Sequence, residues 1–225
     1  MERCAHLMAP YPDRLKGHWL EQFPDQTLLN IEIGCGKGRF TADTAEAHPN
    51  TLFIAVEKVP EAMIIAMERV KNREIANVRF IENDAENLAD MFAPGEAARI
   101  YINFCDPWPK SRDAKHRLTA PYFLRIYAGI LPEGGEIHLK TDNLPLFNWS
   151  FERFKEEGWE LREITNDLHA GGEKITMTDY EAKFCALGVK INRLVAVRRS
   201  DTRDLSSGIP AKPRNASLSD ARGNG

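Results

Sequence analysis

The stretch Leu28-Leu-Asn-Ile-Glu-Ile-Gly-Cys-Gly-Lys-Gly-Arg-Phe40 determines how the rest of the chain is arranged. Its first part, Leu28 to Ile33, is a compact apolar run typical of a buried β-strand. The three glycines that follow let the backbone turn sharply and approach a ligand closely; they are Gly34, Gly36 and Gly38. An alanine-rich segment that ends near Pro49 favours a helix. The stretch therefore predicts a strand, a glycine turn and a helix.

Acidic residues before and after this turn indicate which ligand it binds. A second apolar strand, Leu52 to Val56, ends on Glu57. An acid at this place in nucleotide-binding α/β folds takes the hydroxyl pair of a ribose. Glu32 puts a negative charge directly before the glycines, whereas a pyrophosphate prefers a neutral lining and a helix N-terminus. S-adenosylmethionine carries an ammonium and a sulfonium, so it is favoured over a dinucleotide.

The remaining chain alternates between apolar strands and helical segments. Further strands are predicted at Asn77 to Ile81, Ile100 to Phe104, Glu136 to Lys140, Glu160 to Ile164 and Lys190 to Val197. Helices are predicted from Pro60, over Thr119 to Ile130, and from Leu146 to about Glu157, with a loop entering a short helix over residues 171–184. This alternation predicts an α/β fold: a doubly wound, mostly parallel seven-stranded sheet, Rossmann-like, with helices on both faces.

The domain organisation follows from composition. Residues 1–26 contain apolar positions broken by prolines and predict short helical pieces on the rim of the domain. Residues 1–199 are predicted to form a single domain. Residues 200–225 are rich in Ser, Asp, Gly and Pro, and we expect them to be a disordered tail.

Charge and cysteine content limit the class of protein. The formal net charge of −3 means that any surface for nucleic acid is a local patch on a mildly acidic body. The four cysteines are scattered, without the spacing of a zinc site or a disulfide framework. We therefore expect no metal. We also expect no membrane contact, because no apolar run approaches the length of about 20 residues needed to span a bilayer. A reducing cytoplasm is the expected compartment, and the sequence is compatible with a monomer or a homodimer.

The segment from Arg99 to Arg117 carries the candidate substrate site. Its prolines, after Asp106 and Trp108, end a buried strand at Asp106. In an open α/β sheet this delivers Asp106, Trp108 and Lys110 to the edge where ligands bind. A carboxylate, an indole and an ammonium suit a nucleobase on a polynucleotide. The basic group continues with Arg112, Lys115, His116 and Arg117. The alternative is a two-proline turn followed by a solvated charged loop.

A third acidic position follows the strand that ends at Ile81. Asp84 is placed to face an adenine, whose exocyclic amine can donate to a carboxylate. The alternative for Asp84 and Glu86 is a helix cap or a solvated acidic loop.

Six motifs together resemble the bacterial tRNA (guanine-N7-)-methyltransferase family, a class I S-adenosylmethionine-dependent family, over about residues 1–199. They are Ile31-Glu-Ile-Gly-Cys-Gly-Lys-Gly38, Val56-Glu57-Lys58, Asn83-Asp84-Ala85, Asn103-Phe-Cys-Asp-Pro-Trp-Pro-Lys110, Lys140-Thr-Asp142 and Thr178-Asp-Tyr-Glu181. The glycine turn is common to all class I methyltransferases, whereas Asp-Pro-Trp-Pro-Lys with a downstream Thr-x-Tyr-Glu is close to unique to this family.

The resemblance implies the roles of particular residues. Glu32, Glu57, Asp84 and Asp106 line the site for S-adenosylmethionine, and the residues that meet tRNA are Lys110, Asp142, Thr178, Asp179, Tyr180 and Glu181. The expected product is 7-methylguanosine at position 46 of the variable loop. The chain departs from the family at Asp113 and His116, which weaken the basic patch, and relatives often begin with an arginine- and lysine-rich arm that this chain lacks.

The chemistry expected of this site needs alignment and charge stabilisation. The N7 atom of guanine has a free lone pair at neutral pH, so methyl transfer requires no general base. Asp106 is the predicted catalytic residue, because its carboxylate can hold the base edge and offset the developing positive charge; Asp142 is the second candidate. Two other classes are weighed against this function: a noncatalytic RNA-binding protein with the same fold, and a nicotinamide-dependent oxidoreductase.

Overall fold

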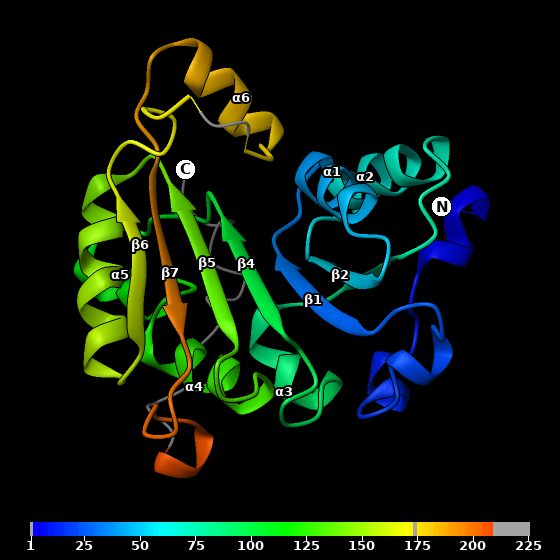
Figure 1. Cartoon of the computed structure of the whole chain (residues 1–225), viewed down its shortest axis with the longest axis horizontal. Helices are drawn as coiled ribbons and strands as arrows, with labels where there is room; N and C mark the ends of the chain where they lie inside the picture. The colour runs from blue at the N-terminus through cyan, green and yellow to red at the C-terminus, as the bar shows by residue number, and fades with distance from the viewer. Residues whose placement is uncertain (1, 173–174, 209–225) are drawn as a thin grey trace, which may run out of the picture.

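The computed structural model describes residues 2–172 and 175–208, and its seven strands form one sheet in the order β3-β2-β1-β4-β5-β7-β6 (Figure 1). The strands are β1 (Leu28–Ile33), β2 (Thr51–Glu57), β3 (Val78–Glu82), β4 (Arg99–Asn103), β5 (Glu136–Thr141), β6 (Glu160–Thr165) and β7 (Asn192–Val197). β7 runs antiparallel to its neighbours β5 and β6, and the other neighbouring pairs are parallel. The predicted mostly parallel seven-stranded sheet is confirmed.

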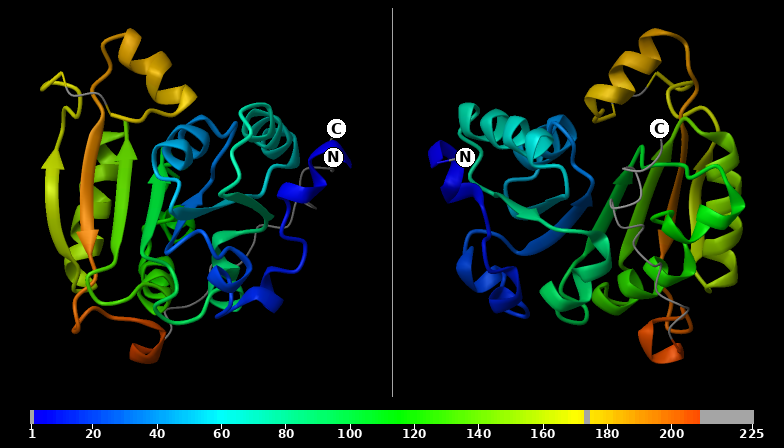
Figure 2. Two further views of the ribbon diagram at one scale, coloured as in Figure 1. Left: turned by 45° about the vertical axis from the view of Figure 1, so that its right-hand side comes forward. Right: turned by 180° about the vertical axis from the view of Figure 1, so that it is seen from behind.

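Helices cover both faces of the sheet (Figures 1 and 2). The α-helices are α1 (Arg39–Ala47), α2 (Pro60–Asn72), α3 (Leu88–Met91), α4 (Pro121–Ile130), α5 (Leu144–Glu156) and α6 (Asp179–Ala186). Short 3-10 helices are η1 (Glu2–Leu7), η2 (Pro12–Leu15), η3 (Leu20–Gln22), η4 (Ala85–Asn87), η5 (Ser111–His116) and η6 (Leu205–Ser207). On one face α2 contacts α1 and η1, and on the other face α4 contacts α3 and α5. None of the helices described is long and apolar enough to cross a membrane.

Strand β2 shows how one apolar run serves both faces. Leu52, Ile54 and Val56 join the core beneath α3, α4 and α5, whereas Phe53 and Ala55 join the core beneath α1 and α2. Successive side chains of a strand point to opposite faces, so a strand buried on both sides must be apolar throughout. The uninterrupted burial of β2 from Thr51 to Glu57 is the consequence.

The structure differs from the sequence prediction after residue 199. Thr202 is buried, its Oγ1 donates to the Gly158 carbonyl at 3.0 Å, and Leu205 packs against the core. The Arg203 amide donates to the Glu157 carbonyl, also at 3.0 Å. Residues 200–208 are therefore docked on the domain, because a few well-placed side chains outweigh a polar average composition. Residues 209–225 of the predicted tail lie outside the described residues.

Candidate active site

A cavity of about 500 Å³ lies at the carboxyl ends of β1, β2, β3 and β4. Parallel strands bring their carboxyl ends to one edge of a sheet, where ligands bind in folds of this kind. Several residues of the predicted site lie on its wall: Gly34, Glu57, Asp84, Asp106, Trp108 and His116. Residues on the wall that the sequence did not single out as site residues include Asn83, Asn103 and Phe104.

The glycine turn forms the floor of this edge. Gly34 and Gly36 have φ angles of 75° and 54°, which side chains rarely adopt, and no atom lies within 4 Å of where their Cβ atoms would be. Gly38 has a different reason to be glycine, because its Cβ would lie 2.5 Å from the Cβ of Ala66 on α2. The turn thus leaves open space above the first two glycines and close packing below the third.

Glu57 is fixed in place by backbone donors. Its Oε2 accepts from the Gly36 amide at 2.8 Å, and its Oε1 accepts from the amides of Lys58 and Val59 at 2.9 and 3.0 Å. The side chain is buried in the protein except where it lines the cavity. A carboxylate has about four acceptor sites, so part of its capacity is left for a ligand, and the contact of Glu57 with a ribose remains a prediction.

Glu32 lies beneath the cavity and does not line it. Thr41 Oγ1 donates to one of its oxygens, and Asn103 Nδ2 donates to the other at 3.1 Å. Burial raises the pKa of Glu32 to about 7, although both hydrogen bonds and the charge of Lys140 oppose the shift. A direct contact of Glu32 with a cofactor remains a prediction, and in this structure its carboxyl group positions Asn103.

Asn103 is the residue that sequence analysis missed as a site residue. It is the last residue of β4 and lines the cavity, and its Oδ1 is buried with no hydrogen-bond partner among the described residues. A buried carbonyl oxygen without a donor is rare, so we expect a water or a bound ligand to supply the missing donor. The signal in the sequence was a polar residue that ends an otherwise apolar strand.

Asp84 caps a short helix, which is one of the roles weighed for it, and it also lies on the cavity wall, while its contact with an adenine remains a prediction. Its Oδ1 accepts from the Glu86 amide at 3.3 Å and so caps η4, and its side chain also lines the cavity. Asp84 lies at the end of β3, across the cavity from the β4 side. Capping fixes its direction and leaves part of the carboxylate facing the cavity.

The Asp-Pro-Trp-Pro segment forms the opposite wall. Phe104 and Trp108 have φ angles of 54° and 43°, unusual values for bulky residues, and they bracket Asp106. Because Phe104 turns the chain there, β4 ends at Asn103 and not at the predicted Asp106. Residues held in such sparsely populated conformations cluster at functional sites. Asp106 itself is exposed at the mouth of the cavity.

Arg117, predicted to face RNA, is buried and holds this wall from behind. Its Nε donates to the Pro107 carbonyl and its Nη2 to the Trp108 carbonyl, each at 2.9 Å. Its guanidinium lies 4.5 Å from the ring centroid of Trp149. Burial lowers the pKa of Arg117. The structure therefore corrects the prediction for Arg117, which acts within the protein and is not free to bind phosphate.

The other members of the basic patch are placed outward. Arg112 is 77% exposed, and Lys110 and Lys115 are also exposed. The ring of His116 lies 5.2 Å from that of Trp108, so this histidine belongs to the cavity wall as much as to the patch. η5 carries Arg112, Lys115 and His116 on one short turn beside the cavity.

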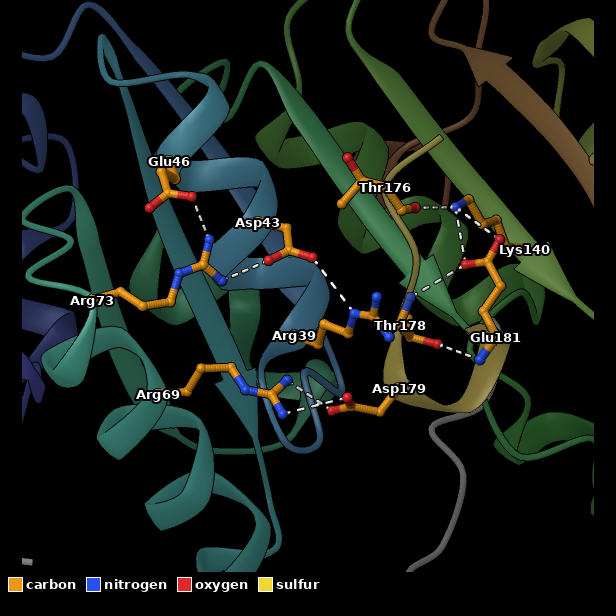
Figure 3. A network of polar contacts seen from close by, with 10 residues as sticks. All are labelled: Arg39, Asp43, Glu46, Arg69, Arg73, Lys140, Thr176, Thr178, Asp179 and Glu181. Atoms are coloured by element: carbon orange, nitrogen blue, oxygen red, sulfur yellow. Dashed lines mark hydrogen bonds and ion pairs between the residues drawn. The ribbon is translucent and has the colours of Figure 1, made fainter. Parts of the chain in front are cut away.

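Helix α6 lies beyond the carboxyl end of β5 (Figure 1). Thr178 caps this helix: its Oγ1 accepts from the Glu181 amide at 2.9 Å, and the Glu181 side chain accepts from the Thr178 amide. Arg69 of α2 pairs with Asp179 at 2.8 Å, and Lys140 of β5 pairs with Glu181 (Figure 3). Thr178, Asp179 and Glu181 are thus engaged within the protein, and their predicted contacts with substrate remain predictions.

Tyr180 and Asp142 are brought together as predicted substrate residues. The Tyr180 hydroxyl donates to Asp142 Oδ2 at 3.2 Å, and the Tyr180 ring is 42% exposed. The same ring lies 5.1 Å from that of Phe104, which lines the cavity. Tyr180 therefore connects α6 to the wall that carries Asp106. In the described residues, no group of three His, Cys, Asp or Glu side chains is placed to hold a metal ion.

Comparisons with known proteins agree with this arrangement. The family model described as a putative methyltransferase matches residues 26–194. The tRNA (guanine-N(7)-)-methyltransferase of Brevibacillus brevis is 45% identical over 183 residues, which is 80% of this chain and 86% of that protein. The enzyme of the same name from an Exiguobacterium species is 42% identical over 200 residues, covering 88% and 93%. Among solved structures, the 16S rRNA methyltransferase KamB matches 81% of this chain and 93% of its own with a TM-score of 0.61 and 16% identity, a likeness of fold alone. The chain belongs to the tRNA (guanine-N7-)-methyltransferase family.

Proposed function

We propose that this protein transfers a methyl group from S-adenosylmethionine to N7 of a guanosine in tRNA, at position 46 of the variable loop, in the cytoplasm. One observation carries the proposal: a single cavity joins the glycine turn and Glu57 on one side to the Asp-Pro-Trp-Pro segment on the other. A cofactor held on the first side and a base held on the second would meet beside Asp106. The relatives named above, 42% and 45% identical, are tRNA (guanine-N7-)-methyltransferases.

The residues present fit S-adenosylmethionine. The cofactor supplies an electrophilic methyl group on a sulfonium when it is bound. Glu57 would hold its ribose hydroxyls, and Asp84 would accept from its adenine amine. The unpartnered Oδ1 of Asn103 would accept from its ammonium, and the open space above Gly34 and Gly36 leaves room for close approach to the backbone. Glu32 supports this set from below through Asn103.

The protein has to position guanine and stabilise charge, and it has no proton to remove from N7. The product ring is positively charged, so a carboxylate near it is worth more in the transition state than before the reaction. Asp106 would accept from the N1 and N2 hydrogens of guanine and offset this charge. Trp108, 37% exposed beside it, offers a flat apolar surface to the base.

The outer surface of this edge fits an RNA backbone. Lys110, Arg112 and Lys115 are exposed beside the cavity and would contact phosphates, which positions the RNA without reading its bases. Asp142 and Tyr180 would contact the nucleotide from the α6 side. Because the patch is small on a chain of net charge −3, we expect the shape of the RNA and the base held in the cavity to contribute much of the recognition.

Methylation of defined tRNA transcripts tests the proposal. A transcript with guanosine at position 46 should gain one 7-methylguanosine, mapped by cleavage at the modified base, when the protein and S-adenosylmethionine are both present. A matched transcript with adenosine at position 46 should gain none. Methylation at another guanosine would refute the assigned position, and no methylation of any tRNA would refute the function.

A further inference from the structure

Lys140 is a buried charged residue to which no role in binding or catalysis has yet been given. It lies near the end of β5 and is 5% exposed. Its Nζ donates to both carboxylate oxygens of Glu181, at 3.2 and 3.1 Å, and to the Thr176 carbonyl at 2.8 Å (Figure 3). All three hydrogens of the ammonium therefore have acceptors, and these acceptors belong to the first turn of α6 and to the segment that leads into it.

The Glu181 carboxylate is buried and has polar partners besides Lys140. Its side chain has no exposed surface, and it also contacts His169 Nε2 at 3.0 Å and the Thr178 amide at 3.3 Å. Removing one partner of an ion pair buried this deeply strongly destabilises the folded protein, because the other charge is left unpaired. Lys140 thus places its ammonium directly against the buried carboxylate of Glu181, which His169 also contacts.

Lys140 also adjoins the opposite side of the site. In the sheet it lies beside Asn103, a residue of the cavity wall whose side-chain Oδ1 is buried without a hydrogen-bond partner among the described residues. Its own carbonyl accepts from the Phe104 amide at 2.9 Å, at the start of the Asp-Pro-Trp-Pro segment. The same residue therefore contacts the wall of the cavity through its backbone and α6 through its side chain.

We propose that Lys140 is a positioning residue for the reaction: by holding Glu181, it fixes the first turn of α6, and with it Tyr180, against the cavity wall where guanosine binds. This inference rests on the proposed function. Tyr180 contacts Phe104 and Asp142, so a shift of α6 would move Tyr180 away from this wall without touching Glu57 or the glycine turn.

Lys140→Met provides the test, with both substrates measured separately. We expect kcat/KM for tRNA to fall by at least about tenfold, up to the order of 100-fold that a displacement of about 1 Å can cause. The Kd for S-adenosylmethionine should stay within about twofold of wild type. Amide hydrogen exchange should quicken in residues 178–186 and stay unchanged in β1, β2 and β3.

Arg125→Met is the matched control. Arg125 forms a similar buried pair with Glu157, in which the side chains are 13% and 4% exposed, next to residues 200–208 and away from α6. This variant should lose stability as Lys140→Met does, yet keep wild-type kcat/KM for tRNA and wild-type exchange in α6. An equal loss of tRNA kinetics in both variants would show that lowered stability is the cause and would overturn the inference.

Other outcomes are equally decisive. Unchanged exchange in α6, or a loss of cofactor affinity as large as the loss in kcat/KM, would overturn the role of Lys140. If Lys140→Met does not fold, the double variant Lys140→Met with Glu181→Gln removes both charges of the pair and is measured instead. Faster exchange in α6 of the double variant would support the inference, and unchanged exchange would overturn it. Inactivity of the wild-type protein on every tRNA would refute the proposed function instead, and exchange in α6 would still report on Lys140.

Discussion

Arg69 of α2 holds Asp179 of α6 in a two-pronged ion pair, with Nη1 2.8 Å from Oδ2 and Nη2 3.3 Å from Oδ1. The pair is partly exposed, at 29% and 41%, so its energy is small, less than about 1 kcal/mol. We expect Arg69→Ala to leave the free energy of unfolding nearly unchanged and to increase hydrogen exchange in α6. The effect should weaken at high salt, because exposed pairs are screened.

Arg73, the residue directly after α2, is the control for this prediction. It pairs with Asp43 and Glu46 of α1, on the same side of the site, and its side chain is 30% exposed (Figure 3). Arg73→Ala should therefore leave exchange in α6 unchanged. If both substitutions increase that exchange equally, a general weakening of α2 is responsible and the cross-link has no effect of its own.

Glu57→Ala should weaken binding of S-adenosylmethionine. The loss of one or two charge-assisted hydrogen bonds to the ribose corresponds to about 1.5 to 3 kcal/mol each. Calorimetric titration measures this directly. Glu61→Ala, which removes an exposed carboxylate from the first turn of α2, should leave the affinity at the wild-type value. Unaltered affinity in Glu57→Ala would exclude Glu57 from the cofactor site.

Arg112 and Arg117 should behave oppositely although sequence analysis placed them in one patch. Arg112→Ala should lower the slope of log affinity for tRNA against log salt by about one and leave stability unchanged. Arg117→Met should lower the free energy of unfolding by roughly 1.5 to 3 kcal/mol, because two carbonyl groups lose a charged donor. A reduced salt slope without any loss of stability in Arg117→Met would contradict its buried position.

Glu32→Gln should change how stability depends on pH. Burial raises the pKa of Glu32 from 4.5 to about 7 in the folded protein. Between these values the folded state binds the proton and the unfolded state does not, so this group lowers stability as pH rises. Each pKa unit corresponds to about 1.36 kcal/mol, so the cost above pH 7 is about 3 kcal/mol.

Glutamine cannot ionise, so Glu32→Gln should gain stability relative to wild type by up to about 3 kcal/mol as pH rises from 4 to 8. Urea unfolding at several pH values gives this difference. The lowered pKa of His138, about 4, affects both proteins alike and cancels from it. A difference that is constant with pH would show that folding does not raise the pKa of Glu32.

The fold was predictable because its signals are local and repeated. The apolar run of β1, the glycines and the helix that follows require only neighbouring residues to be recognised, and the alternation of such units sets a parallel sheet. The docking of residues 200–208 was missed because it depends on Thr202 and Leu205 meeting partners far away in the sequence. The average composition of the segment does not reveal such contacts.

The site was predictable in its position and less so in the roles of its members. Glu57 and Asp84 follow strand ends and therefore face the cavity, as topology requires. Arg117 has the same composition signal as Arg112, yet it turns inward because the Pro107 and Trp108 carbonyls and the Trp149 ring offer it partners. Only three-dimensional contacts distinguish an arginine that shapes a loop from one that binds phosphate.

Asp106 is the residue on which the chemistry should depend. It lies in the turn between Phe104 and Trp108, and Arg117 holds that turn through backbone carbonyls. Within the part of the chain that the structure describes, no hydrogen bond or ion pair engages the Asp106 side chain. The turn therefore does not need this carboxylate to keep its shape, and the carboxylate is free for the base.

Asp106→Asn keeps the shape of the side chain and removes its charge. If the carboxylate offsets charge that appears as N7 becomes methylated, the rate should fall more than either affinity, on the order of 100-fold. Single-turnover methylation with saturating cofactor and tRNA measures this, because saturation removes binding defects from the comparison. Asp113→Asn, on the same cavity wall, controls for the general loss of negative charge and should change the rate much less.

A rate for Asp106→Asn within about twofold of wild type, well under the tenfold that corresponds to about 1.36 kcal/mol, would assign Asp106 a structural role. The catalytic proposal would then pass to Asp142, which accepts a hydrogen bond from Tyr180 and would contact the nucleotide from the α6 side.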